Sequence, residues 1–151
     1  MVAHLDSMNF NGHPNDERMK GIVMRVVRKE DISTPIKNPS GEEIYDMIGR
    51  PPESGGTIRH SVAHVVIPSG KSSHAHYHKE SEETYYILKG VSSMRVDTKT
   101  FRLEPGQACL IKPFETHQIF NEGEDDLEFL AVSAPAWTPD DSFFTTEEKR
   151  N

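Results

Sequence analysis

Residues 70–83 read Gly70-Lys-Ser-Ser-His74-Ala-His76-Tyr-His78-Lys-Glu80-Ser-Glu82-Glu83. This stretch is the most informative about the fold, because residues 74–83 hold three histidines and three carboxylates. In an extended segment alternate side chains share a face, so His74, His76 and His78 would project together. Three imidazoles on one face suit a borderline metal ion better than an apolar core. The alternative is a solvated polar edge whose histidines alternate by chance.

Two further residues strengthen the metal hypothesis. Glu83 follows a short polar turn and leads into Thr84-Tyr-Tyr-Ile-Leu, a run that predicts a strand pairing antiparallel with the histidine segment. His117 follows a second strand-like run from a distant part of the chain. Three imidazoles and one carboxylate would leave about two positions of an octahedron open for water or substrate.

The spacing of these residues resembles the first motif of the cupin family, G(X)5HXH(X)3-4E(X)6G. Gly70, His76, His78, Glu83 and Gly90 match it with five, one, four and six intervening residues. An alternative register through His74, His76 and Glu80 finds no glycine at the required spacing. Glu82 competes with Glu83 because three intervening residues are also allowed, and the position of Gly90 favours Glu83.

The second cupin motif, G(X)5PXG(X)2H(X)3N, is matched in part. Gly106, His117 and Asn121 stand at the expected spacings, whereas Lys112 replaces the usual proline and Phe114 the usual second glycine. The resemblance implies an all-β fold of two antiparallel sheets, the double-stranded β-helix or jelly-roll barrel. It also implies one divalent transition metal (Mn, Fe, Ni, Co or Zn) inside the barrel near one open end, held by His76, His78, Glu83 and His117.

The residue pattern outside the motifs agrees with a β-rich domain. Short runs rich in β-branched and aromatic residues predict strands at 22–27, 43–48, 58–67, 84–88, 92–96, 108–111, 116–120 and 127–133. Pro, Ser and Gly predict loops at 33–41 and 50–56. We expect a flexible or loosely docked N-terminal arm at 1–20, one barrel at 21–137 and a C-terminal tail at 138–151, in which Phe143 and Phe144 cover something apolar.

Four residues are candidates for catalysis beside the metal, and each has a structural alternative. His60 and His64 share the parity of Val62 and Val66 in the predicted strand 58–67, so they would point into the barrel or lie on its outer face. Tyr85 shares the parity of Glu83 and would offer a phenol to a ligand or simply pack. His74 would line the cavity mouth, transfer protons or be a surface residue.

The composition limits which classes of binding partner we expect for this protein. A formal net charge of -7, from 17 Lys and Arg against 24 Asp and Glu, leaves no basic excess for nucleic acid. A single cysteine, Cys109, and the lack of a long apolar run predict a cytoplasmic protein without a membrane partner. The resemblance implies a small-molecule partner and a homodimer, because small cupins pair through their sheets.

The functional hypothesis is a metal-dependent enzyme of the isomerase, dioxygenase or decarboxylase type, acting on a small polar sugar-like or carboxylate metabolite. The alternative is a non-catalytic, metal-containing barrel that binds a small molecule. A weaker third option is a structural metal that only stabilises the fold.

Overall fold

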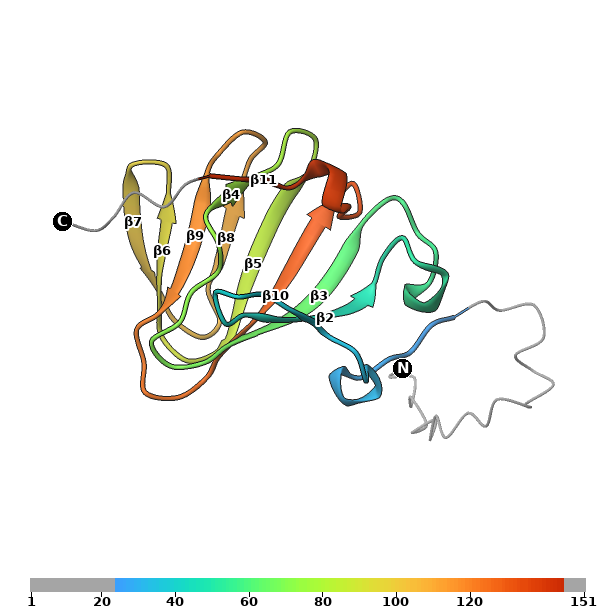
Figure 1. Cartoon of the computed structure of the whole chain (residues 1–151), viewed down its shortest axis with the longest axis horizontal. Helices are drawn as coiled ribbons and strands as arrows, with labels where there is room; N and C mark the ends of the chain where they lie inside the picture. The colour runs from blue at the N-terminus through green and yellow to red at the C-terminus, as the bar shows by residue number, and fades with distance from the viewer. Residues whose placement is uncertain (1–23, 146–151) are drawn as a thin grey trace, which may run out of the picture.

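The computed structural model describes residues 24–145, and in that range the chain forms two antiparallel sheets (Figure 1). The strands are β1 (Ile36–Lys37), β2 (Glu43–Ile48), β3 (Ser61–Ile67), β4 (His76–Tyr77), β5 (Glu82–Lys89), β6 (Ser92–Val96), β7 (Lys99–Leu103), β8 (Ala108–Ile111), β9 (His117–Asn121), β10 (Leu127–Ala134) and β11 (Phe143–Phe144). Short 3-10 helices occur at η2 (Lys29–Asp31), η3 (Pro52–Ser54) and η4 (Pro139–Asp141). None of the helices in this range has the length and apolar character needed to span a membrane.

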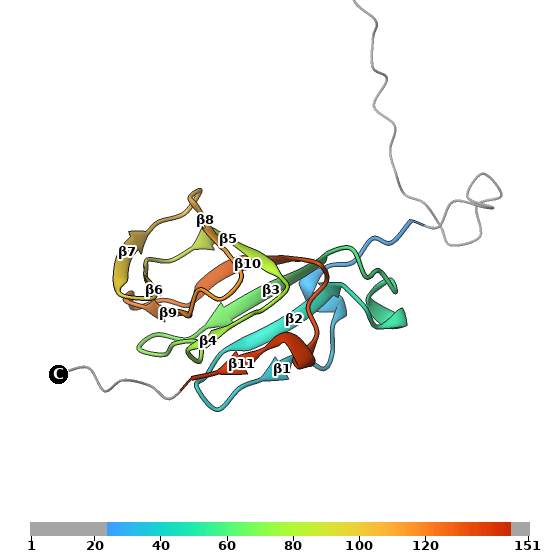
Figure 2. The same ribbon diagram turned by 90° about the horizontal axis from the view of Figure 1, so that it is seen from above.

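The strand order confirms the predicted all-β jelly-roll fold. One sheet runs β1-β2-β3-β10-β5-β8 and the other β11-β4-β9-β6-β7. Strands distant in sequence are neighbours, since β10 lies between β3 and β5 and β9 lies between β4 and β6. Seen from above, the two sheets lie on opposite sides of the interior (Figure 2).

The core lies between the sheets, and strand alternation explains how it forms. Along β5, Glu83, Tyr85 and Ile87 are buried, whereas the alternate residues Tyr86 and Leu88 are exposed. Buried side chains from both sheets form one apolar cluster: Val65, Ile67, Tyr85, Ile87, Met94, Leu103, Ile111, Ile119, Leu127 and Phe129. Glu83 therefore extends the same inward row as the core, which carries its carboxylate into the barrel.

The predicted strands differ from the structure at the N-terminal side. The predicted arm 1–20 and residues 22 and 23 of the strand 22–27 lie outside the described residues. The remainder of that strand is wrong, because residues 24–27 are irregular and Val26 is exposed without a neighbouring strand. The predicted strand 58–67 begins only at Ser61. The structure adds β1, β7 and β11, which are too short or too polar to give a clear strand pattern. The predicted antiparallel pairing of the histidine segment with the strand after Glu83 is wrong, because β4 pairs with β9 and β11 whereas β5 pairs with β10 and β8 in the other sheet.

The beginning of the C-terminal segment is docked on the barrel. After η4, β11 pairs antiparallel with β4, with Phe143 opposite Tyr77 and Phe144 opposite His76. The Phe143 and Tyr77 rings stack with their centroids 5.2 Å apart. The segment thus covers a strand of its own chain, and it brings η4 beside the histidine segment.

Candidate metal centre

The four residues of the predicted metal cluster come together in the interior. His76 lies on β4, His78 directly follows it, Glu83 lies on β5 and His117 begins β9. Their candidate ligand atoms all lie within 4.8 Å of one another. His76 is opposite His117 in the pairing of β4 with β9, so sheet register sets part of this geometry.

Hydrogen bonds to the backbone fix the orientation of all three imidazoles. Nδ1 of His76 lies 2.9 Å from the carbonyl oxygen of His74, and Nδ1 of His117 lies 3.1 Å from that of Glu115. Nδ1 of His78 lies 2.7 Å from the carbonyl oxygen of Asp141. A carbonyl oxygen can only accept, so each Nδ1 carries a proton, which leaves the Nε2 lone pair of each neutral ring available for a metal ion.

The carboxylate of Glu83 faces these nitrogen atoms. Its Oε2 lies 3.1 Å from Nε2 of His117 and 3.2 Å from Nε2 of His78, while its Oε1 accepts a 2.8 Å hydrogen bond from the Ser133 hydroxyl. Nε2 of His78 is buried and makes no hydrogen bond. A buried nitrogen without a hydrogen bond, among imidazoles of fixed tautomer and one carboxylate, fits a divalent transition metal.

Burial and charges within the cluster shift the pKa values of its members in different directions. Burial, followed by the charge of His117, lowers the pKa of His76 to about 4, so this ring is neutral at pH 7. Burial alone would raise the pKa of Glu83, but the imidazoles of His117 and His78, whose Nε2 atoms lie 3.1 and 3.2 Å from its Oε2, outweigh it and hold the pKa well below its usual range. Burial lowers the pKa of His78, and the opposing interactions with Glu83 outweigh it and raise the pKa.

Asp141 of η4 supports the site from outside the motifs. Its carboxylate accepts hydrogen bonds from the backbone N–H groups of Lys79, Glu80 and Ser81, with the shortest contacts at 2.8, 3.1 and 3.0 Å. Its backbone carbonyl is the partner of His78 Nδ1. Asp141 therefore holds both the turn after His78 and the ring itself. The sequence prediction missed it because it lies in the expected tail, 138–151.

The loop before His117 has a left-handed backbone conformation at one of the two departures from the second motif. Phe114, which replaces the usual glycine, adopts φ +68°, the left-handed region that glycine occupies easily. Its N–H donates a 2.7 Å hydrogen bond to the carbonyl oxygen of His78. This conformation costs a non-glycine residue about 1 to 2 kcal/mol, and the hydrogen bond to the histidine segment helps to offset it.

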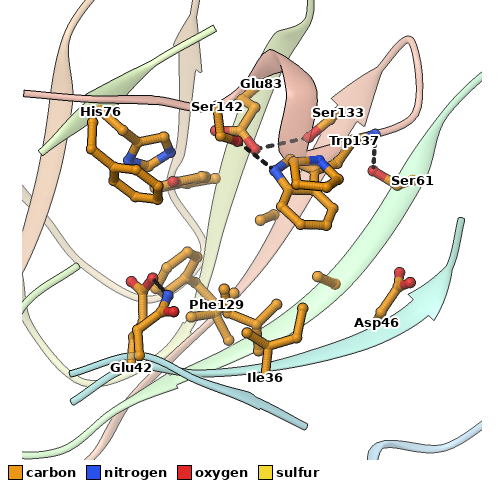
Figure 3. A pocket seen from close by; sticks show the side chains of 18 residues that line it. Ile36, Glu42, Asp46, Ser61, His76, Glu83, Phe129, Ser133, Trp137 and Ser142 are labelled. Carbon is orange, nitrogen blue, oxygen red and sulfur yellow. Dashed lines mark hydrogen bonds between the residues drawn. The ribbon is translucent and has the colours of Figure 1, made fainter. Parts of the chain in front are cut away.

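An apolar cavity of about 270 Å³ opens beside the cluster (Figure 3). His76 and Glu83 lie on its wall, together with Tyr85, Phe129 and Trp137. The Phe129 and Tyr85 ring centroids are 4.6 Å apart, and the Tyr85 and His117 rings form a T-shaped pair with centroids 5.8 Å apart. The cluster thus has a side that a small molecule can approach.

The four candidate catalytic residues lie in different environments in the structure. Tyr85 lines the cavity, where burial and then the charges of Glu83 and Glu42 raise its phenol pKa well above the usual value. His74 is half-buried, and its ring forms a T-shaped pair with that of Phe144, with centroids 5.6 Å apart, rather than contacting the cluster.

Of the two orientations left open for His64, the structure shows the one on the outer face, and His60 does not line the cavity either. Ser61, Ala63 and Val65 of β3 line the cavity, so His64 has the opposite parity and lies on the outer face, 2.8 Å from Glu128. His60 precedes β3 and is exposed.

Glu42 is a carboxyl-bearing residue of the cavity wall that the sequence prediction missed. It precedes β2, is only 7% exposed and lines the cavity in one alternating row with Ile44 and Asp46.

Comparisons with known proteins agree with this geometry. Residues 63–133 match the family model of the cupin domain. The chain is 30% identical over 122 residues to an uncharacterized protein of Methanocaldococcus jannaschii, a match covering 80% of this chain and 96% of that protein.

The chain belongs to the cupin superfamily.

Two further proteins are similar to this chain, one in sequence and one in fold. An oxalate-binding protein of Thermotoga maritima is 39% identical over 70 residues, which covers 46% of this chain and 58% of that protein. A double-stranded β-helix protein of Klebsiella pneumoniae has a TM-score of 0.66 at 16% identity, covering 82% of this chain and 99% of the other, which supports the fold alone.

Proposed function

We propose that this cupin is a metal-dependent enzyme of the isomerase, dioxygenase or decarboxylase type that acts on a small oxygenated metabolite. The observation that carries the proposal is the arrangement of four ligand atoms within 4.8 Å of one another on the wall of a cavity. Three neutral imidazoles and one carboxylate suit Mn, Fe, Ni, Co or Zn. A divalent metal bound there would polarise an oxygen atom of the substrate as a Lewis acid.

The residues around the site support chemistry rather than a purely structural metal. His76, His78, Glu83 and His117 make four donors, fewer than an octahedral ion requires, and His76 and Glu83 border the cavity. A ligand bound against the largely apolar cavity walls would displace water, which would strengthen electrostatic interactions within the site.

The test is metal analysis of protein purified without added metal, followed by assays with each candidate metal. Sugar phosphates, keto acids and catechols are screened for turnover. We expect one metal to support turnover of at least one compound, and the Glu83→Ala variant to lack that activity. Turnover that survives in Glu83→Ala would contradict the proposal.

The second candidate function is a non-catalytic small-molecule binder. The similarity to the Thermotoga maritima oxalate-binding protein favours it. A binder would retain a bound compound stoichiometrically without converting it. Mass spectrometry of the compound recovered after incubation with the metal-loaded protein distinguishes the two functions.

We also propose a homodimer formed through the outer face of the six-stranded sheet. Tyr86 and Leu88 of β5 and Leu110 of β8 expose 42%, 40% and 54% of their surfaces there. These three exposed apolar side chains on neighbouring strands suit contact with a second copy of this chain, since the charged parts of two surfaces of net charge -7 repel each other. Light scattering should give twice the chain mass, and Leu110→Glu should halve it. A monomeric wild-type protein would contradict this prediction.

A further inference from the structure

The cavity contains a carboxyl group that the metal cluster does not use. The Glu42 side chain accepts a hydrogen bond from the Asn38 amide, and within residues 24–145 no basic side chain forms an ion pair with it. Figure 3 shows Glu42 and Ile36 along one side of the cavity and His76, Glu83 and Trp137 along the other. A buried carboxyl facing a cavity rather than a cation needs a partner of another kind.

The electrostatics of Glu42 are suited to a neutral partner. Burial raises its pKa to about 7, while the Asn38 hydrogen bond opposes this shift; the charge of Glu83 raises the pKa and that of His117 lowers it. Near neutral pH the group is therefore partly protonated, and its O–H can donate a hydrogen bond to an oxygen atom.

Most of the remaining cavity wall is aromatic and aliphatic, and its other polar side chains are Asn38, Asp46, Ser61, Ser133 and Ser142. Among the described lining residues there is no lysine or arginine. The indole N–H of Trp137 donates to the Ser142 hydroxyl at 2.9 Å, so the polar atom of that ring already has a partner. A phosphate or a dicarboxylate would have no cationic side chain to pair with on these walls, whereas a flat ring would contact Trp137 and Phe129.

The volume is consistent with a small ring compound. An apolar protein cavity of about 150 Å³ is known to hold benzene. At about 270 Å³, this cavity has room for one or two fused rings with hydroxyl or carbonyl substituents.

We propose that the cavity binds an uncharged, ring-shaped compound bearing hydroxyl or carbonyl oxygens, and that the protonated Glu42 carboxyl donates a hydrogen bond to one of them. The proposal rests on the proposed function and deepens it by naming a substrate class: it narrows the sugar-like or carboxylate expectation to neutral compounds, and so favours the isomerase and dioxygenase types over a decarboxylase. Glu42 is a binding residue on the wall facing His76 and Glu83, and its role does not require that it touch the metal.

The experiment uses Trp137, the only tryptophan of the sequence, as the reporter of occupancy. Resorcinol is titrated against the full chain while tryptophan fluorescence is recorded, with oxalate and glucose 6-phosphate as anionic competitors. Resorcinol is a phenol and stays neutral below about pH 8.5, because phenols ionise near pH 10. We expect resorcinol to quench the fluorescence and both anions to displace it weakly, both with zinc bound and after chelation.

The pH profile tests Glu42 itself. If only the protonated carboxyl binds, the affinity for resorcinol falls about tenfold between pH 6 and pH 8, because the proton leaves a group with a pKa of about 7. The groups whose charges act on Glu42, namely Glu83 and His117, and its neighbour Tyr85 are present in every variant. Glu42→Gln, which cannot ionise, should bind with an affinity that changes less than twofold over this range.

Glu43→Gln is the matched control. Glu43 is the next residue, but it faces outward to Lys37 and to the Tyr45 hydroxyl, so this variant should keep the wild-type profile. Tighter binding of oxalate or glucose 6-phosphate than of resorcinol would overturn the ligand class. A flat wild-type profile, or identical profiles for the two variants, would overturn the role of Glu42. Because these measurements also run on chelated protein, they are independent of whether any metal supports turnover.

Discussion

Replacing Glu83 with alanine is expected to remove the bound transition metal from the purified protein. The change deletes the single carboxylate of the cluster, which lies within 3.2 Å of Nε2 of both His78 and His117. It also leaves the buried Ser133 hydroxyl without its acceptor. His76→Ala should lose the metal as well, since it removes one of three imidazole donors. Elemental analysis should give about one metal ion per wild-type chain and less than about a tenth in either variant.

Two neighbouring residues provide the controls. Glu82→Ala removes the adjacent carboxylate, which is exposed, and His74→Ala removes a ring that contacts Phe144 instead of the cluster. Both variants should retain the wild-type metal content. Metal retained in Glu83→Ala and His76→Ala, or lost equally in Glu82→Ala, would contradict the ligand assignment.

The metal cluster could be predicted from the sequence because spacing and strand alternation determine it locally. His76 and His78 lie two residues apart at one strand, and Glu83 extends the inward row of β5 that continues through Tyr85. The position of His117 depended on the second motif. In the structure it begins β9 directly opposite His76, a pairing that the sequence alone does not specify.

The interior residues of β3 could not be predicted in the same way. Both parities of this strand carry apolar side chains, with Val62 and Val66 on one face and Val65 and Ile67 on the other. The strand is central, between β2 and β10, so both faces are partly covered and alternation does not identify the inner one. His64 is instead held outside by Glu128, which also pairs with Lys29 of η2 at 3.2 Å.

Glu42 and Asp141 were not predicted as part of the site, because their environments are formed by segments that are distant in the sequence. Glu42 follows a predicted loop in the sequence, and only the closure of the barrel buries its carboxyl in the cavity. Asp141 lies about 60 residues from the backbone groups that it binds. Neither residue belongs to a motif whose spacing would reveal it.

Asp141→Ala is expected to destabilise the fold and to weaken metal binding together. Three N–H groups of the turn after His78 lose their acceptor, and because water replaces it only in part, we expect a loss of about 3 kcal/mol in the free energy of unfolding. Metal affinity should fall about 10- to 100-fold, as is typical when the support of a ligating histidine is disturbed. Chemical denaturation measures the first effect and competitive zinc titration the second.

Two measurements distinguish the specific role of Asp141 from the general effect of removing a negative charge. One is the pH dependence of the stability, and the other is a variant of the neighbouring residue Asp140. Burial alone would raise the pKa of Asp141, but hydrogen bonds from Lys79, Ser81 and Glu80 outweigh it and lower the pKa below its usual 3.8. The stabilisation by its carboxylate is therefore present above about pH 4 and is lost as the pH falls through the lowered pKa, so the variant should approach the wild type in stability only in strong acid. Asp140→Ala removes the exposed carboxylate next to it in η4 and should match the wild type in both measurements. Equal behaviour of the two variants would show that the η4 segment does not support the metal centre.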